Sequence, residues 1–195
     1  MNYQGLGQPD AKAEQVVLLD PDRQPQGTAD KATVHRKTRD GGTPLHMAFS
    51  CHVVDAQGRL LMTRRALGKA AFPGVWTNAF CGHPGPGEEL ETAIRRRAHQ
   101  ELGLHLAEVA TALPDFAYRA SDAAGVEENE VCPVFIARTH QAEPTPHPAE
   151  ADDWAWVDPD DLHTAVTATP FAFSPWVTLQ IKAGLLRQIP TQSGI

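Results

Sequence analysis

The chain has 195 residues, of which 42% are hydrophobic, and this size and composition suit one globular domain with a buried core. Its 24 acidic and 17 basic residues give a formal net charge of −7, and neither sign forms a long run. This balance excludes a basic face for a nucleic-acid backbone, so we expect no nucleic-acid partner. Residues 1–12 lack the apolar region of a signal peptide, and no segment approaches the roughly 20 apolar residues of a membrane span. We therefore expect no membrane association and a cytoplasmic location.

The three cysteines, Cys51, Cys81 and Cys132, are odd in number and widely spaced, which favours a reducing compartment over a disulfide framework. Cys51 and Cys132 lie in apolar segments and are interpreted as core residues, whereas Cys81 is interpreted as a free thiol. We expect one domain over residues 1–195, with flexible tails at 1–15 and 189–195, and a monomer in solution.

The first part of the chain predicts three strands. Residues 15–19 form a short apolar run, and the Pro-, Gly- and Asp-rich segment 20–30 after it predicts a turn. The apolar runs 46–54 and 60–64 predict two further strands, because the sequence Asp-Ala-Gln-Gly at 55–58 between them is typical of a hairpin.

Two helices are predicted. Residues 88–102 carry apolar side chains at a helical period, and Gly103 directly after them is a typical helix terminator. Ser174 followed by Pro175 fits an N-cap and a first-turn proline, and predicts a helix that continues to Leu186.

The remaining predicted elements are strands. Residues 116–119 and 130–139 predict a pair joined by the polar link 120–127, and residues 154–157 predict one more. The strands and helices alternate without a regular βαβ repeat, so the pattern favours a mixed α+β fold over a doubly wound sheet.

Residues 82–104 carry the first specific motif. Its characteristic residues are Gly82, Glu88, Arg96, Glu101, Gly103 and Leu104. The motif resembles the Nudix box, a loop–helix–loop that holds a divalent metal against a diphosphate. Arg97 and Gln100 stand where a Nudix hydrolase would usually have glutamates, so part of the expected carboxylate cluster is missing. This departure counts against hydrolysis.

Four further motifs narrow the resemblance. They are Trp76-Thr77-Asn78, Cys81-Gly82-His83-Pro84, Glu128-Asn129-Glu130-Val131-Cys132-Pro133 and Phe173-Ser174-Pro175-Trp176. In this order they resemble the type I isopentenyl diphosphate isomerase family, and the resemblance runs from about residue 16 to residue 186. It implies a Nudix-like mixed β-sheet sandwiched by helices, and interconversion of isopentenyl and dimethylallyl diphosphate.

The spacing within two of these motifs predicts convergent side chains. In an extended segment, residues two apart face the same side, so Glu128 and Glu130 can point together, as can Cys81 and His83. The resemblance implies a metal held by a set of three histidines and two glutamates, namely His35, His46, His83, Glu128 and Glu130. Such nitrogen and oxygen ligands suit an octahedral Mn, Mg or Zn ion better than a closed structural zinc site.

The resemblance also implies the catalytic residues. Cys81 and Glu130 would be the acid/base pair that moves a double bond by one position, and Tyr118 would relay or orient the proton. Trp176 would supply an aromatic face to the intermediate carbocation. Without its family motif, Cys81 would be interpreted as a packing residue.

The substrate diphosphate would be held by positive charge. By the resemblance, the basic residues at this position are Lys31, Arg65, Lys69 and Arg97, with Arg64 as a possible helper. Glu101 would hold a Mg²⁺ ion that bridges to the phosphate oxygens.

Two other functions use the same motifs. A Nudix hydrolase of a nucleoside or prenyl diphosphate would share the box but would not need Cys81. A non-catalytic binding module with a structural metal is the second alternative. His52 is expected to be a decoy, because strand alternation puts it on the same face as His46 without a motif of its own.

Overall fold

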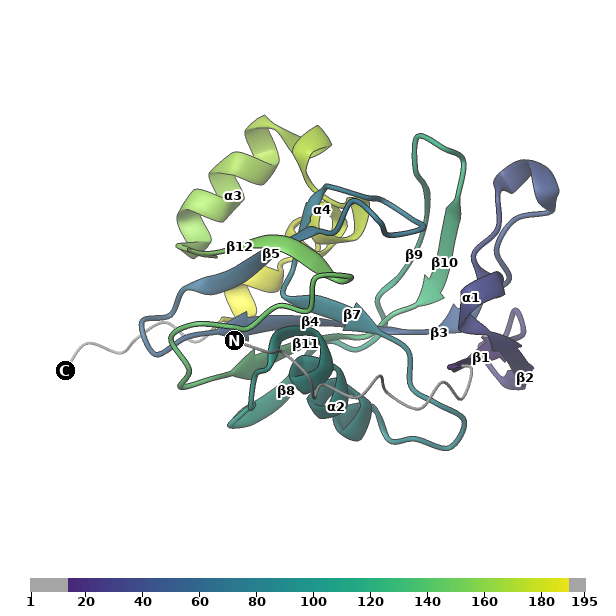
Figure 1. Ribbon diagram of the computed structural model, residues 1–195, viewed down its shortest axis with the longest axis horizontal. Coiled ribbons are helices and arrows are strands. Elements are labelled where there is room, and N and C mark those ends of the chain that lie inside the picture. Colours follow the sequence, from purple (N-terminus) through teal and green to yellow (C-terminus); the bar gives the residue numbers. More distant parts are fainter. Residues whose placement is uncertain (1–13, 190–195) are drawn as a thin grey trace, which may run out of the picture.

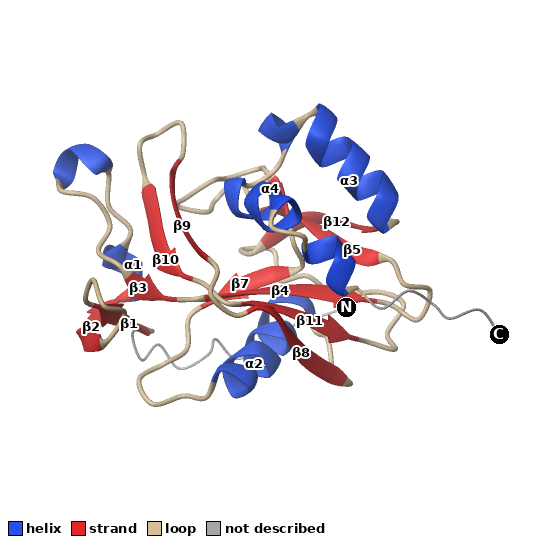
Figure 2. Cartoon of the chain, turned by 180° about the vertical axis from the view of Figure 1, so that it is seen from behind, coloured by secondary structure: helices blue, strands red, loops and turns tan. Residues whose placement is uncertain are grey.

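The computed structural model describes residues 14–189, which form two mixed β-sheets with helices on both faces of the larger sheet (Figures 1 and 2). The smaller sheet has the order β2-β1-β3-β10-β9. Its strands are β1 (Gln15–Leu19), β2 (Pro25–Asp30), β3 (His46–Met47), β9 (Ala117–Ser121) and β10 (Glu127–Val131). The pair β3 and β10 runs parallel, whereas the other neighbours are antiparallel.

The larger sheet has the order β12-β5-β4-β11-β8, with β6 paired to β5 and β7 paired to β4. Its strands are β4 (Phe49–Val54), β5 (Leu60–Arg65), β6 (Trp76–Thr77), β7 (Phe80–Gly82), β8 (Glu108–Leu113), β11 (Val134–Arg138) and β12 (Ala151–Val157). β4 is buried throughout, as a strand covered on both faces must be.

Two adjacent strands pass from one sheet into the other. β3 continues into β4 after Ala48, and β10 continues into β11 after Cys132 and Pro133. The prediction of one strand over 130–139 is therefore wrong at this point. Pro133 has no backbone N–H for a ladder, which is why the strand ends before it. This junction brings Glu130 of β10 within 3.3 Å of His83, the residue directly after β7.

The larger sheet separates two apolar clusters. One cluster joins alternate β4 residues such as Phe49 and Cys51 to the inner face of α2 (Leu90–Leu102), through Ala93 and Ile94. On the opposite face, α3 (Pro159–Ala168) and α4 (Pro175–Lys182) cover the second cluster. Helices on both faces of a mixed sheet are the predicted arrangement, and Figure 1 shows α2 on one side and α3 and α4 on the other.

The two predicted helices are present with their predicted caps. Gly103 ends α2 in the left-handed conformation, with φ of 63°. The Ser174 side chain accepts from the Val177 N–H at the start of α4. α4 ends at Lys182, and the four residues before Ile189 form a separate 3-10 turn.

Several elements differ from the prediction. Segment 20–30 is only partly a turn, because Pro25–Asp30 pairs with β1 as a strand. The helix α3 and the strand β8 were not predicted. Within the predicted tails, Glu14 pairs with Lys31, Gln15 begins β1 and Ile189 is buried. The other residues of these tails, 1–13 and 190–195, lie outside the described residues. In the part of the chain that is described, no helix is long and apolar enough to cross a membrane.

Candidate active site

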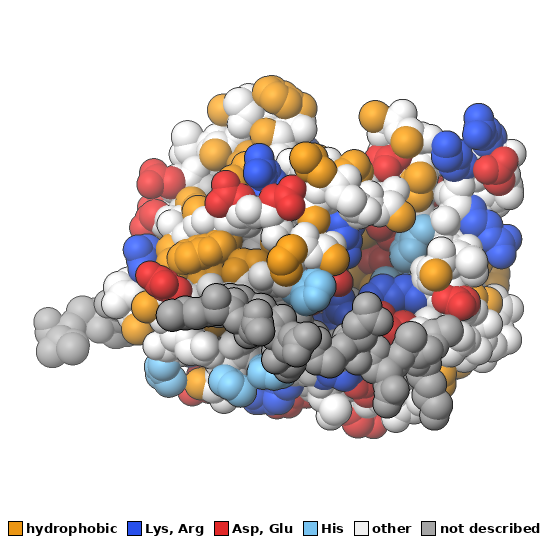
Figure 3. All heavy atoms as spheres, in the orientation of Figure 1, with side chains coloured by type: hydrophobic (Ala, Val, Ile, Leu, Met, Phe, Trp, Pro, Cys, Tyr) orange, Lys and Arg blue, Asp and Glu red, His pale blue; other side chains and the backbone are white. Residues whose placement is uncertain are grey.

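A cavity of about 620 Å³ opens beside the junction of the two sheets. On the face shown in Figure 3, basic, acidic and histidine side chains gather in the hollow next to the β9–β10 hairpin. Among residues 14–189, its lining includes five acidic and four basic side chains. Every residue predicted for the site lines this cavity except His46, Glu101 and the helper Arg64.

Three imidazoles and one carboxylate converge beneath the cavity. The ligand atoms of His35, His46, His83 and Glu130 all lie within 4.8 Å of one another. Glu130 Oε1 is 3.4 Å from His46 Nε2 and 3.3 Å from His83 Nε2. The register explains the pair, because β10 places Glu130 opposite His46 of the parallel strand β3. His83 comes from the end of β7, and His35 from the C-terminal end of the short helix α1 (Lys31–Val34).

Glu128, the fifth predicted ligand, contacts this group at His35. Its Oε2 lies 2.9 Å from His35 Nε2, and both Glu128 and Glu130 face the cavity, as their spacing predicts. Burial and the charge of Glu130 raise the pKa of Glu128. Burial also opposes ionisation of Glu130, but hydrogen bonds from His46 and His83 outweigh it and hold that pKa well below its usual range. Glu130 is therefore the carboxylate of the pair that stays ionised.

These side chains fit a divalent cation. His46 Nδ1 lies 2.9 Å from the Pro44 carbonyl, which can only accept, so Nδ1 carries a hydrogen; Nε2 would offer a lone pair to a metal once it gives up the proton that it shares with Glu130. His35 Nε2 is buried and, although close to Glu128, makes no aligned hydrogen bond. His46 Nε2 and His83 Nε2 lie only 3.2 Å apart. A divalent cation would satisfy all of these nitrogens at once, and imidazole and carboxylate donors are ligands that such cations take.

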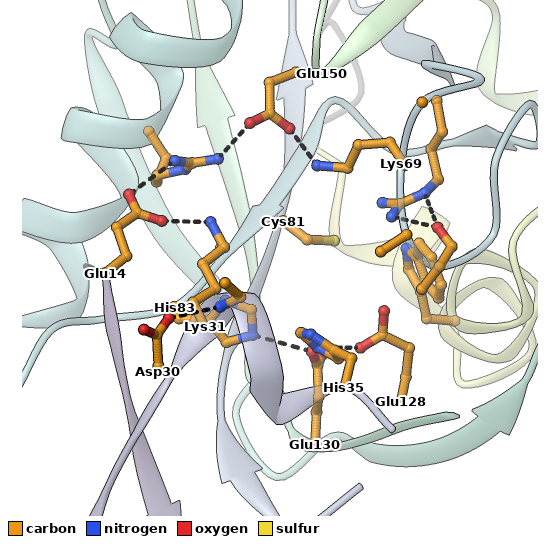
Figure 4. A pocket seen from close by; sticks show the side chains of 18 of the residues that line it. Glu14, Asp30, Lys31, His35, Lys69, Cys81, His83, Glu128, Glu130 and Glu150 are labelled. Atoms are coloured by element: carbon orange, nitrogen blue, oxygen red, sulfur yellow. Dashed lines mark hydrogen bonds and ion pairs between the residues drawn. The ribbon is translucent and has the colours of Figure 1, made fainter. Parts of the chain in front are cut away.

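Cys81 lies on β7 between this group and the basic residues (Figure 4). Its sulfur is 3.5 Å from Ser50 Oγ, on the neighbouring strand directly opposite. Burial raises the pKa of the Cys81 thiol to about 12; the hydrogen bond with Ser50 opposes the shift and the charge of Glu130 adds to it. The group that faces the cavity is therefore a protonated thiol, which can donate its hydrogen.

Two aromatic side chains form a wall of the cavity. Tyr118 on β9 stands opposite Glu130 of β10, and its ring lies 5.6 Å from that of Trp176. Burial raises the pKa of Tyr118 well above its usual value, so its hydroxyl keeps its hydrogen. The Arg65 guanidinium carbon is 5.4 Å from the Trp176 ring centroid. The wall thus presents aromatic faces and one cation to the cavity that Cys81 and Glu130 also line.

The other three basic residues lie together at one end of the cavity. Lys31 Nζ contacts Glu14 at 2.5 Å, Lys69 pairs with Glu150, and Arg97 reaches both carboxylates at 3.3 and 3.2 Å. Figure 4 shows Lys69 beside Glu150, and Lys31 extending from next to His83 towards Glu14. Glu14 and Glu150 leave little net positive charge in this row.

Glu101 lies apart from the histidine group. It is buried in α2 and accepts a 2.7 Å hydrogen bond from Arg97 Nε. It lines a small cavity that it shares with Cys81, Lys69 and Glu150, next to the main one. Burial raises the pKa of Glu101, although the charge of Arg97 opposes the shift.

Several residues of the site carried no predicted role. Glu14 and Glu150 lie in irregular segments with no motif, so no sequence signal pointed to their pairing with the basic residues. Asn78 is fully buried beside Cys81 and belongs to a quoted motif, which was its only signal. Arg64 does not line the cavity, and His52 is buried against Gln180, outside the histidine group, as expected of a decoy.

The chain is similar to known proteins over most of its length. The family model described as NUDIX domain matches residues 44–177. The isopentenyl-diphosphate Delta-isomerase of Clavibacter michiganensis subsp. michiganensis is 62% identical over 86% of this chain and 84% of its own length. The protein of the same name from Agromyces mediolanus is 59% identical over 89% of this chain and 82% of its own length. The one from Frankia alni is 53% identical over 94% of this chain and 92% of its own length.

Solved structures agree with this fold. DR0079 from Deinococcus radiodurans has a TM-score of 0.65 at 19% identity and covers 91% of this chain and 100% of its own. A MutT NUDIX hydrolase from Burkholderia pseudomallei has a TM-score of 0.55 at 24% identity, over 75% of this chain and 98% of its own. The predicted Nudix-like α+β fold is thus confirmed, and the chain belongs to the isopentenyl-diphosphate Delta-isomerase family of NUDIX-domain proteins.

Proposed function

We propose that this protein interconverts isopentenyl diphosphate and dimethylallyl diphosphate. One observation carries the proposal: a protonated thiol, Cys81, and an ionised carboxylate, Glu130, line the same cavity. A double-bond shift needs one group that gives a proton and one that takes a proton. The relatives that share 52–62% identity carry the name of this reaction.

The reaction balances with these two groups. Addition of a proton to the terminal methylene carbon of isopentenyl diphosphate forms a tertiary carbocation. Loss of a proton from the carbon between the cation and the CH₂–O group then forms the internal double bond. We assign these two transfers to Cys81 and Glu130, with Tyr118 orienting a proton at Glu130, and the reverse reaction uses the same groups in the opposite order.

The aromatic wall supports a cationic intermediate. Trp176 is 2% exposed, and its ring face stabilises a desolvated cation by about 2 kcal/mol or more. Water would capture the carbocation, so a cavity wall built from Trp176 and Tyr118 also protects the intermediate.

The polar end of the substrate is assigned to the basic row. Lys31, Lys69 and Arg97 lie together with Arg65 at the cavity, which matches the three or more donors that a diphosphate accepts. We assign a Mg²⁺ site to Glu101, supported by its closeness to these bases and to Glu150. This anchor would hold the five-carbon tail against the aromatic wall.

The proposed isomerisation also requires a divalent metal at the histidine group. We assign His35, His46, His83 and Glu130 as direct ligands, with Glu128 as a further carboxylate beside His35. A Mn²⁺ or Zn²⁺ ion there would supply positive charge that lowers the proton affinity of Glu130. The support for this assignment is the buried His35 Nε2, which lacks an aligned partner, and the 3.2 Å contact between His46 Nε2 and His83 Nε2.

Three of our predictions concern the protein as a whole. We propose a cytoplasmic location because all three cysteines are free. We also retain the predictions of a monomer and of one domain over residues 1–195. Size-exclusion chromatography with light scattering tests the first of these two, and limited proteolysis tests the second.

Phosphorus and proton NMR of the metal-loaded protein with isopentenyl diphosphate tests the proposed function. Conversion to dimethylallyl diphosphate with both phosphorus signals intact supports isomerisation. Release of inorganic phosphate would favour the Nudix hydrolase instead, and an unchanged spectrum from folded, metal-loaded protein would favour a binding module.

A further inference from the structure

The side chain of Asn78 has every hydrogen-bonding position occupied. It is fully buried in the turn between β6 and β7. Its Nδ2 donates to the carbonyls of Cys51 and Phe80 at 2.9 and 2.7 Å, and its Oδ1 accepts from Trp176 Nε1 and Thr77 Oγ1, both at 2.9 Å. Carbonyls only accept and an indole N–H only donates, so these contacts fix which end of the amide is which.

The sulfur of Cys81 rests against this saturated amide. It lies 3.5 Å from both Oδ1 and Nδ2 of Asn78, and also 3.5 Å from Ser50 Oγ. An amide has two N–H groups and two lone pairs, and all four are already used. Of the two acceptors at 3.5 Å from the sulfur, Ser50 Oγ and Asn78 Oδ1, we assign the thiol hydrogen to Ser50, whose own hydroxyl lies 3.4 Å from Gln180 Oε1 on α4.

We infer that Asn78 is a positioning residue for the isomerisation: one buried amide holds the sulfur of Cys81 and the indole of Trp176 in a fixed relation to each other. The inference deepens the proposed function and rests on it. Cys81 and Trp176 come from segments 95 positions apart in the sequence, so some contact must set their relative position. A second contact holds the segment that carries Asn78 against the start of α4: the Ser174 N–H donates to the Trp76 carbonyl at 2.8 Å.

The position of these two groups matters because they act on neighbouring atoms of one small substrate. A displacement of about 1 Å from a productive geometry can lower a rate by about 10²-fold. Loss of Asn78 frees the indole and the sulfur together, without touching the basic residues or the histidine group. The defect is expected in kcat and not in KM.

A matched pair of variants separates positioning from simple stability. Asn78→Ala removes the amide, whereas Thr63→Val removes a buried 2.9 Å hydrogen bond to the Asn78 main-chain carbonyl and leaves the amide intact. We expect Asn78→Ala to lower kcat by about 10²-fold with KM within about threefold and metal content unchanged. Thr63→Val should lower the melting temperature but keep kcat within about threefold of the parent value.

An infrared measurement tests the inference without any turnover. The S–H stretching band of Cys81 is obtained as the difference between the spectra of the parent protein and Cys81→Ala. Trp176→Phe removes the indole N–H and so frees one lone pair on Asn78 Oδ1. We expect the thiol hydrogen to turn towards that oxygen, and the S–H band to shift; in Thr63→Val the band should stay in place.

Two results would overturn the inference. One is an S–H band that does not move in Trp176→Phe, and the other is an equal loss of kcat in Asn78→Ala and Thr63→Val. The infrared result stands even if Asn78→Ala does not fold. If the parent protein has no isomerase activity, the proposed function fails, while the band still reports whether Asn78 links the two side chains.

Discussion

Acid should destabilise this protein through His52, a buried histidine outside the catalytic group. His52 is fully buried on β4, where its Nε2 lies 2.8 Å from Gln180 Oε1 and its Nδ1 has no partner. Burial lowers the pKa of His52 to about 4, and the hydrogen bond with Gln180 offsets only part of that shift. Protonation would place a charge on a ring whose second nitrogen has no acceptor.

The size of the effect follows from the two pKa values. The unfolded chain protonates His52 near pH 6.5, whereas the folded chain resists protonation down to about pH 4. The contribution of neutral His52 to the free energy of unfolding is therefore complete above pH 6.5. As the pH falls, the free energy of unfolding decreases by about 2 kcal/mol at pH 5 and by about 3 kcal/mol below pH 4.

Urea unfolding of the metal-free protein at pH 8 and pH 5 measures this effect. His52→Gln should be less stable at pH 8 but should lose about 2 kcal/mol less than the parent protein between the two pH values. His163→Gln, on the exposed side of α3, is the matched control and should behave as the parent does. An equal loss in His52→Gln and the parent would refute the reasoning.

Four further substitutions test the site. Cys81→Ala should lower kcat by about 10²- to 10⁴-fold in steady-state assays with an unchanged circular dichroism spectrum, and near-normal activity would refute its role. Glu130→Gln should lose a comparable rate and also bind less metal by elemental analysis; full metal content would remove Glu130 from the ligands. His83→Ala should weaken metal affinity in calorimetric titration, and unchanged affinity would contradict the ligand set. Gly82→Ala places a Cβ 2.8 Å from Phe49 Cζ, so urea unfolding should show a loss of about 1–3 kcal/mol, and an unchanged midpoint would contradict the packing.

The sequence predicted the convergence at the site better than it predicted the fold around it. Spacing alone placed Glu128 and Glu130 on one side of a strand, and the resemblance to the family assigned His35, His46 and His83 to the same metal site. The short spacing within each motif is a local property, so it transfers from sequence to structure without knowledge of the sheet order.

The predictions that were wrong concern segments whose conformation depends on contacts with distant parts of the chain. The apolar run 130–139 is continuous in hydrophobicity, but Pro133 divides it between two sheets. Segment 25–30 is exposed and polar, and it forms a strand only because β1 offers an edge to pair with. Asp158 and Pro159 open α3 with the same cap and first-turn proline that revealed α4, so this helix was predictable from its sequence.

The charges at the cavity were the least predictable feature. The four basic residues were expected to face a diphosphate, but Glu14 and Glu150 already occupy three of them. Such pairing depends on loops that approach from distant parts of the chain, and no residue pattern encodes it.

The most direct test of the account is deuterium incorporation during turnover in D₂O. Metal-loaded protein is incubated with isopentenyl diphosphate, and the product is analysed by proton and deuterium NMR at early times. The account predicts dimethylallyl diphosphate with deuterium in the methyl group that forms from the terminal methylene carbon, and no such product with Cys81→Ala. Dimethylallyl diphosphate without deuterium in that methyl group, or the labelled product at the parent rate from Cys81→Ala, would contradict it.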